Sequence, residues 1–238
     1  MKKPLLIGLV ISTTLFVLSG CNSFVTEKEY EESISVKKDK AKALDVELNL
    51  GIGEINVQKG AEEWVDGNAI YNLKKLKPQV SYDLHRDIGE VVIEHEDQKR
   101  FRISEIKNEW DIKLTDKIPL SLSIETGATM ANLDLKGLKL ESLDIETGVG
   151  DIAIDLGGDW ETSFETNIET GVGQTTVYLP SEVGVKITIE KGIGSSDVVG
   201  FISKGDNVYV NEAYEGADVI LTVSAEMGVG EISFELDK

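Results

Sequence analysis

The sequence predicts an all-β protein, a single-domain β-solenoid of stacked short strands with Gly-x-Gly turns. Three observations lead to this fold class. The hexapeptide IETGVG occurs twice, at residues 145–150 and 168–173. Apolar and polar residues alternate through most of the chain, which is the period of a half-buried strand. Glycine is frequent, with 23 residues, whereas helix start and stop signals are scarce.

Near-copies of the hexapeptide extend the repeat in both directions. IETGAT begins at Ile124, IEKGIG at Ile189 and AEMGVG at Ala225. The first glycines of these phrases are Gly127, Gly148, Gly171, Gly192 and Gly228, with spacings of 21, 23, 21 and 36. Self-similarity at about 20–25 residues is typical of stacked repeats. The long last interval contains residues 201–220, which we interpret as a strand pair inserted in one coil.

One repeat unit reads LDIETGVGDIAIDL, residues 143–156. Leu143 and Ile145 precede the glycines on one face, and Ile152 and Ile154 follow on the same face. We expect two short strands per unit, stacked in register on the next unit. The glycines mark the corner, because a residue without a β-carbon takes positive φ or lets neighbouring coils approach closely. An antiparallel β-sandwich is the alternative, but it predicts variable hairpin loops.

The first half of the chain shows the same alternation with weaker repeats. Residues 44–57 alternate on both sides of a Gly-Ile-Gly turn at 51–53, and residues 80–84 and 90–95 read as strands. We therefore assign residues 33–120 to N-terminal β coils and residues 121–238 to the repeat coils of the solenoid.

The first 21 residues predict export and a lipid anchor. Lys2 and Lys3 precede an apolar stretch at residues 5–20, as in a secretory signal. The stretch ends in Leu-Ser-Gly-Cys at residues 18–21, which resembles a bacterial lipoprotein lipobox. This resemblance implies cleavage between Gly20 and Cys21 and a diacylglycerol on the Cys21 thiol. Residues 1–20 would be the signal peptide and residues 21–32 the lipidated cysteine and its tether. An uncleaved anchor helix is the alternative.

Composition excludes several classes of partner. The chain has a formal net charge of −19, and Cys21 is its only cysteine, so it has no internal disulfide. Residues 1–120 carry 18 Lys and Arg against 21 Asp and Glu, and residues 121–238 carry 6 against 22. Such a surface repels nucleic acid and other anionic polymers and favours cations or basic partners.

The order of these phrases resembles a known family. Phrases such as NEWDIKL, IPLSLSIETG, LDIETGVGDIAIDL and AEMGVGEISF, within about residues 33–236, are similar to the toast-rack β-solenoid domain of adhesin-like bacterial proteins. That domain also forms the C-terminal part of cell-wall-active antibiotic response regulators, which restrain a sensor kinase during envelope stress. Those regulators place transmembrane helices before the domain, whereas this chain has a lipoprotein signal. The resemblance implies no catalytic residues and no cofactor.

Candidate chemistry in the chain is sparse. The two histidines are His85 and His95, and we interpret His95, between Glu94 and Glu96, as a solvated strand end without a metal cluster. One repeat position, before each turn, is acidic in five copies: Glu125, Glu146, Glu169, Glu190 and Glu226. Stacked carboxylates repel one another, so this column is either a site for Ca²⁺ or a solvated, screened row. We expect the solvated row and no metal site.

These observations favour a binding role. We expect a non-enzymatic, lipid-anchored protein on the extracytoplasmic side of the cell membrane, serving envelope-stress response or surface adhesion. Its partner would be another envelope protein or a cell-wall component, held on outward strand faces or on residues 200–220. The alternative is a carbohydrate-active β-helix enzyme acting on a cell-envelope glycan, because carboxylate pairs are abundant.

Overall fold

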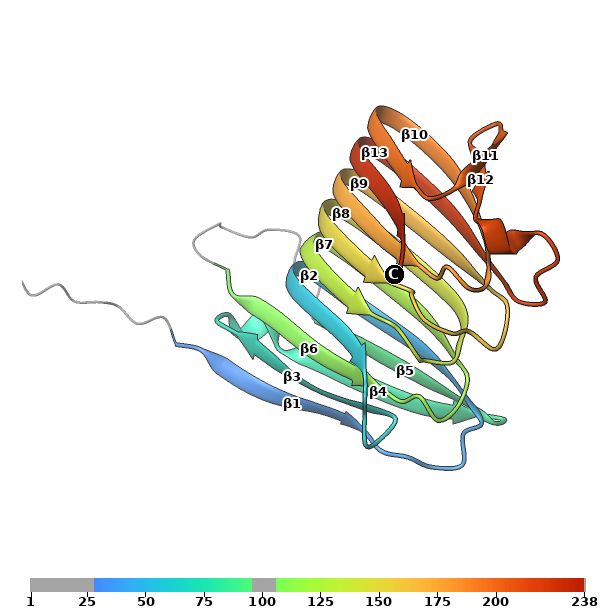
Figure 1. The fold of residues 1–238 in the computed structure, drawn as a ribbon. Helices are drawn as coiled ribbons and strands as arrows, with labels where there is room; N and C mark the ends of the chain where they lie inside the picture. Colours follow the sequence, from blue (N-terminus) through green and yellow to red (C-terminus); the bar gives the residue numbers. More distant parts are fainter. Residues whose placement is uncertain (1–27, 96–105, 238) are drawn as a thin grey trace, which may run out of the picture.

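The computed structural model describes residues 28–95 and 106–237. They form one sheet of 13 strands with two short 3-10 helices (Figure 1). In chain order the elements are β1 (Tyr30–Val36), β2 (Ala43–Lys59), β3 (Val65–Tyr71), η1 (Lys74–Leu76), β4 (Pro78–His85), β5 (Ile88–His95), β6 (Asn108–Leu114), β7 (Leu120–Asp134), β8 (Leu140–Asp155), β9 (Phe164–Leu179), β10 (Gly184–Val199), β11 (Ile202–Gly205), β12 (Val208–Val210), η2 (Glu212–Tyr214) and β13 (Ile220–Leu236).

Six strands of 15–17 residues carry the fold: β2, β7, β8, β9, β10 and β13. Five of them bend at a Gly-x-Gly phrase and β7 bends at Gly127-Ala128-Thr129, so the sheet folds back on itself as a stack of U-shaped strands (Figure 1). We call the part before the first glycine the first arm, and the part that starts at the last residue of the bend phrase the second arm. The solenoid is thereby confirmed, although each unit is one continuous bent strand and not two short ones.

The stack is parallel and in register. Ile145 of β8 lies beside Ile168 of β9, and Ile152 lies beside Thr175. Because side chains alternate between faces, the apolar set of each arm points into the space between the arms. Ile145, Ile152 and Ile154 are all buried there. Burial of each such side chain contributes about 1.5–3 kcal/mol to the stability of the fold.

Spatial order departs from chain order at one end. The strands run β2-β7-β8-β9-β13-β10, so the last strand of the chain inserts between β9 and β10 (Figure 1). A solenoid that adds coils in sequence would place β13 outermost. The insertion leaves β10 as the last long strand, followed by the β11–β12 hairpin that the sequence predicts within residues 201–220.

The other end of the stack is closed by shorter strands. β5 pairs in parallel with the first arm of β2, and β4 pairs antiparallel with β5. On the second arm, β6 pairs in parallel with β2, and β3 and β1 follow antiparallel. β1 begins at Tyr30, inside the segment that the sequence assigns to a tether. Within the described residues, no helix has the length and apolar character that crossing a membrane requires.

Candidate binding surface at the strand bends

The middle residues of the Gly-x-Gly bends form a continuous row along the stack. Successive pairs are aligned across neighbouring strands. The row is Ile52, Ala128, Val149, Val172, Val229 and Ile193, and we call it the apolar ridge. Strands lie about 4.8 Å apart, so six positions span about 24 Å.

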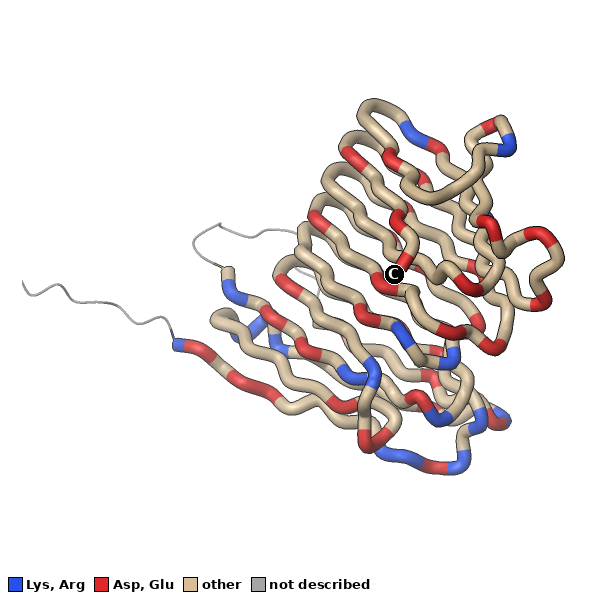
Figure 2. The backbone as a smooth tube through the Cα atoms, viewed as in Figure 1, with Lys and Arg blue, Asp and Glu red and all other residues tan. Residues whose placement is uncertain are grey.

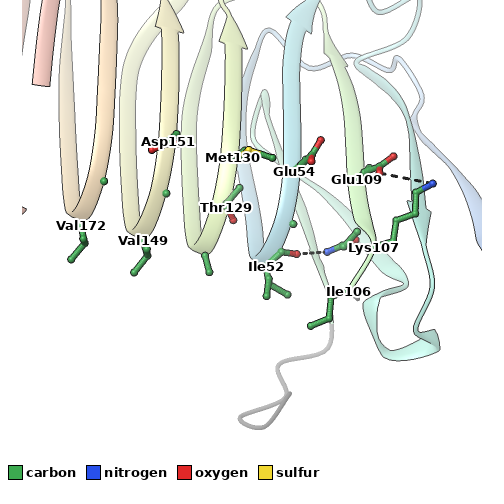
Figure 3. Close-up of a pocket in the computed structure, with 15 residues that line it drawn as sticks. Ile52, Glu54, Ile106, Lys107, Glu109, Thr129, Met130, Val149, Asp151 and Val172 are labelled. Atoms are coloured by element: carbon green, nitrogen blue, oxygen red, sulfur yellow. Dashed lines mark hydrogen bonds and ion pairs between the residues drawn. The ribbon is translucent and has the colours of Figure 1, made fainter. Parts of the chain in front are cut away.

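The side chains of the apolar ridge are exposed to solvent, unlike the apolar side chains between the arms. Val149, Val172 and Val229 are 53%, 45% and 44% exposed, and Ile193 is 74% exposed. Figure 3 shows the side chains of Ile52, Val149 and Val172 at the bends, pointing away from the arms. A contiguous exposed apolar row with polar borders is typical of an interaction site.

A groove runs beside the ridge because the next position is mostly glycine. Gly53, Thr129, Gly150 and Gly173 align there. A β-carbon on Gly150 would lie 1.8 Å from the carbonyl oxygen of Thr129, so the neighbouring backbones are too close for a side chain. The hollow has a volume of about 540 Å³. The floor of the groove is formed by backbone atoms. A ligand could approach these atoms closely, because no side chains cover them.

Side chains of the second arms form the other wall of the groove. Figure 3 shows Met130, Asp151 and Glu54 along this wall. The end of the groove is built by β6 and the residue before it. Asn108 Nδ2 donates to the Ile52 carbonyl oxygen over 2.8 Å, and Lys107 Nζ lies 3.1 Å from a Glu29 oxygen and 3.9 Å from a Glu109 oxygen. Lys107 therefore places the positive charge at this end within reach of two carboxylates.

Acidic residues border the ridge on both arms. On the first arm the five column glutamates are in register, in the spatial order Glu125, Glu146, Glu169, Glu226, Glu190, and all are exposed. On the second arm one column runs in the spatial order Glu109, Glu54, Met130, Asp151, Gln174, Glu231, Ser195, so four of its seven positions are acidic. Figure 2 shows acidic residues on successive strands of the stack. The surface therefore presents an apolar strip between two negative borders.

The column glutamates meet the predicted register but do not make a cation cage. Among residues 28–95 and 106–237, no three His, Cys, Asp or Glu side chains group so that they could hold a metal ion. Each strand contributes one carboxylate per step, and these side chains are exposed. Hard cations such as Ca²⁺ take six to eight oxygen ligands, which such a row does not gather.

The histidines differ in environment. His85 is exposed, with Nδ1 3.5 Å from a Glu90 oxygen. The interpretation of His95 as a solvated strand end is wrong: it is buried, and its Nε2 accepts a hydrogen bond from the Gly51 N–H over 2.9 Å. Its ring lies edge-on to Trp110. Gly20, Cys21 and Glu96 lie outside the described residues.

The apolar ridge is the surface that the sequence reasoning missed. Alternation predicts which face of a strand is buried, but the middle residue of a bend belongs to neither face. The available signal was Val or Ile between two glycines in IETGVG and IEKGIG. When neighbouring strands repeat an apolar side chain at a solvent-exposed bend, the side chains form a contiguous row, which is what indicates an interaction site.

Two family models match the chain. The "N-terminal domain of toast_rack, DUF2154" matches residues 25–178, and "Cell wall-active antibiotics response LiaF, C-terminal" matches residues 129–234. A comparison with curated proteins finds no match.

One solved structure shows the same fold over most of the chain. A candidate cell adhesion protein from Clostridium sporogenes ATCC 15579 is 34% identical, with a TM-score of 0.86 over 88% of this chain and 100% of that chain. A candidate adhesin from Parabacteroides distasonis ATCC 8503 is 12% identical over 89% of this chain and 98% of that chain, with a TM-score of 0.27. A score this low does not establish a shared fold. The family match over most of the chain, together with the identity to the clostridial protein, shows that this chain belongs to the toast-rack family.

Proposed function

We propose that the chain is a lipid-anchored, extracytoplasmic binding or scaffold protein without catalytic activity, serving surface adhesion or the envelope-stress response. The family supports the coarse role, because the clostridial relative is a candidate cell adhesion protein and the second family model concerns the response to cell-wall-active antibiotics. The anchor rests on the resemblance of residues 18–21 to a lipobox.

The observation that carries the binding role is the apolar ridge. Val149 and Val172 expose about half of their surface in a row that the solenoid repeats strand after strand. Burial of such a row against a partner gains about 25 cal/mol for each Å² of apolar surface removed from water. The acidic borders oppose anionic glycans and nucleic acid, so the partner is an envelope protein or cell-wall component with an apolar strip flanked by positive charge.

The test replaces two ridge valines without changing their shape. Val149→Thr and Val172→Thr together keep β-branching and volume but place hydroxyls on the ridge. Cells that lack the gene would be complemented with this variant and scored for attachment to surfaces and for survival with cell-wall-active antibiotics. We expect the variant to restore neither property to the wild-type level, while its melting temperature stays close to that of the wild type.

The matched control makes the same kind of change away from the ridge. Val80 and Ile88 are 41% and 40% exposed on β4 and β5. Val80→Thr with Ile88→Thr should complement as the wild type does. Full complementation by the ridge variant would contradict the proposed surface. Cleavage of a purified cell-envelope glycan by the wild-type protein would contradict the absence of catalysis.

A further inference from the structure

The outer edge of β10 differs between its two arms. On the first arm β12 pairs with Lys186–Thr188, and the Ile189 N–H donates to the Asn207 carbonyl oxygen. On the second arm, no described residue forms a backbone hydrogen bond with the outer edge of Gly194–Val199. This edge is about 20 Å long at about 3.3 Å per residue. Alternate residues direct their N–H and C=O groups outward there, which is a template for another strand.

The three other ends of the stack are closed by antiparallel strands. β4 covers β5 on the first arm, β3 covers β6 on the second arm, and β12 covers β10 on the first arm. The second arm of β10 is thus the one end, within the part of the chain that the structure describes, that lacks such a strand. By the pattern of the other three, an added strand here runs antiparallel.

The core is also unfinished at this edge. Thr175, Ile232 and Ser196 share one inward position on β9, β13 and β10, and the first two are buried while Ser196 is half-buried. Val198 of β10 lies beside Phe234 of β13. Phe234 is fully buried, whereas Val198 is only half-buried. A further strand would cover Ser196 and Val198, and it would need small or apolar residues at alternate positions to do so.

The charge at this edge indicates which residues the added strand would carry on its solvent-facing side. Asp197 is exposed on β10, and Glu231 and Glu235 of β13 lie beside Ser195 and Val199. Lys191 Nζ lies 3.0 Å from the Ser196 hydroxyl, to which it donates a hydrogen bond. Lys or Arg at the alternate positions of the added strand would meet this acidic surface, whereas Asp or Glu would be repelled.

We propose that Gly194–Val199 is a strand-addition site for an extended segment of a partner protein in which apolar residues alternate with Lys or Arg. In this mode the main-chain hydrogen bonds supply affinity, and the alternate side chains supply specificity. The site is separate from the apolar ridge, because its contacts are the edge groups of β10 and not the bends. A partner held here would lie at the end of the stack opposite β1.

The test uses a defined peptide and the full chain without its signal. The probe is a blocked peptide of about eight residues, a typical strand length, with Val alternating with Lys. Binding is measured by calorimetry, and amide hydrogen exchange locates it. We expect slowed exchange within Gly194–Val199. A peptide with N-methylated outward-pairing amides should bind at least about tenfold more weakly, a loss of about 1.4 kcal/mol, because it cannot complete the ladder.

Two variants with the same charge change separate this site from the groove at the bends. Asp197→Lys places the new charge on the free edge, whereas Asp151→Lys places it on β8, in the middle of the stack. We expect Asp197→Lys to weaken peptide binding at least about tenfold and Asp151→Lys by less than about twofold. Equal losses, or binding that survives N-methylation, would overturn the proposal.

Self-association is a distinct outcome of the same experiment. If exchange at Gly194–Val199 slows with rising protein concentration and without peptide, the edge pairs with a second copy and the proposed partner is wrong. If neither peptide nor protein protects the edge, strand addition is wrong altogether. Either result leaves the ridge experiment intact, since its variants lie on other strands.

Discussion

The Gly51 backbone N–H donates a hydrogen bond to Nε2 of His95 over 2.9 Å, and this contact joins β5 to the bend of β2. β5 runs along the first arm of β2 and ends at His95, where β2 turns away. Gly51 leaves space for the imidazole, since a β-carbon there would lie 3.0 Å from the ring. Because Nε2 accepts, the ring carries its proton on Nδ1. The histidine thus satisfies a backbone group that the bend of β2 exposes.

Replacement of His95 by phenylalanine tests this role. His95→Phe keeps an aromatic ring beside Trp110 but removes the acceptor, so the Gly51 N–H loses its partner. We expect the free energy of unfolding to fall by about 1–3 kcal/mol, measured by urea denaturation. His85→Phe, at an exposed position, should change it by less than about 0.5 kcal/mol. Equal stability of the two variants would show that the hydrogen bond contributes nothing.

Gly148 illustrates why the hexapeptide is repeated. A β-carbon at this position would lie 2.6 Å from the Gly127 carbonyl oxygen on the neighbouring strand. That atom is backbone and cannot move without disturbing the ladder. Gly148→Val should therefore lower the free energy of unfolding by about 1–3 kcal/mol, as overpacking does.

The control for the glycine lies in the same bends. Thr129 already carries a β-carbon, and its buried hydroxyl has no hydrogen-bond partner among the described residues. Thr129→Ala removes that hydroxyl and should leave stability unchanged or slightly raised. If Gly148→Val were as stable as Thr129→Ala by urea denaturation, close approach of the strands would not explain the glycines.

Much of the fold follows from the sequence, because alternation and a repeated corner admit few arrangements. Leu143, Ile145, Ile152 and Ile154 are buried as their period predicts. The place of β13 does not follow. Its phrase AEMGVG presents the same register as IETGVG of β9 and IEKGIG of β10, so the repeat itself does not distinguish the possible strand orders.

The candidate site was less accessible to sequence reasoning. The in-register glutamates were predicted, because they occupy strand positions whose face is fixed by alternation. His95 was misread since its burial depends on a contact with Gly51, 44 residues away in the chain. The apolar ridge and the free edge of β10 both depend on which strands become neighbours, which no local pattern encodes.

Glu146 tests the energetic state of the glutamate column. Its neighbours Glu125 and Glu169 lie one strand away on either side, and charges at about 5 Å in water repel by less than about 1 kcal/mol. Glu146→Gln should raise the free energy of unfolding by up to about 0.5 kcal/mol at low salt, and the gain should vanish at high salt. Thermal denaturation across a salt series measures both, with Glu161→Gln in an exposed loop as the control.

Calcium distinguishes the two interpretations of the same column. Solvated carboxylates predict no heat on titration with Ca²⁺ and no shift of the melting temperature between Ca²⁺ and EDTA. A bound cation would instead stabilise the wild type and lose that effect in Glu146→Gln. Such a result would show that the column is a cation site.

Asp39 makes the stability of the fold depend on pH in the acidic range. Its carboxylate accepts a hydrogen bond from the Ala41 N–H over 2.9 Å and one from Trp64 Nε1 over 3.2 Å. The Ala41 bond is the main cause of a lowered pKa of this carboxyl, with a smaller effect of Trp64. A lowered folded-state pKa stabilises the protein above the ordinary pKa of about 3.9, and this contribution is lost as the pH falls through the folded value.

The Asp39→Asn variant removes that titration. Between about pH 6 and pH 2.5 the free energy of unfolding should fall further for the wild type than for the variant. The difference between the two free energies should therefore shrink on acidification. Urea denaturation at a series of pH values measures the difference. A constant difference at every pH would show that the Asp39 charge does not contribute.

Cys21 is the predicted site of the lipid anchor, on which the proposed location at the membrane depends. The thiol is the only one in the chain and closes the Leu-Ser-Gly-Cys phrase, and two acyl chains give stable membrane binding where one is marginal. Cys21→Ser should move the protein from the membrane fraction to the medium or periplasm, as followed by fractionation and immunoblotting. The described fold should be unaffected, because its first strand, among the residues that the structure describes, begins at Tyr30. Ser19→Ala, which keeps a small residue, should stay in the membrane fraction. Retention of Cys21→Ser in the membrane would instead indicate an uncleaved apolar anchor at residues 5–20.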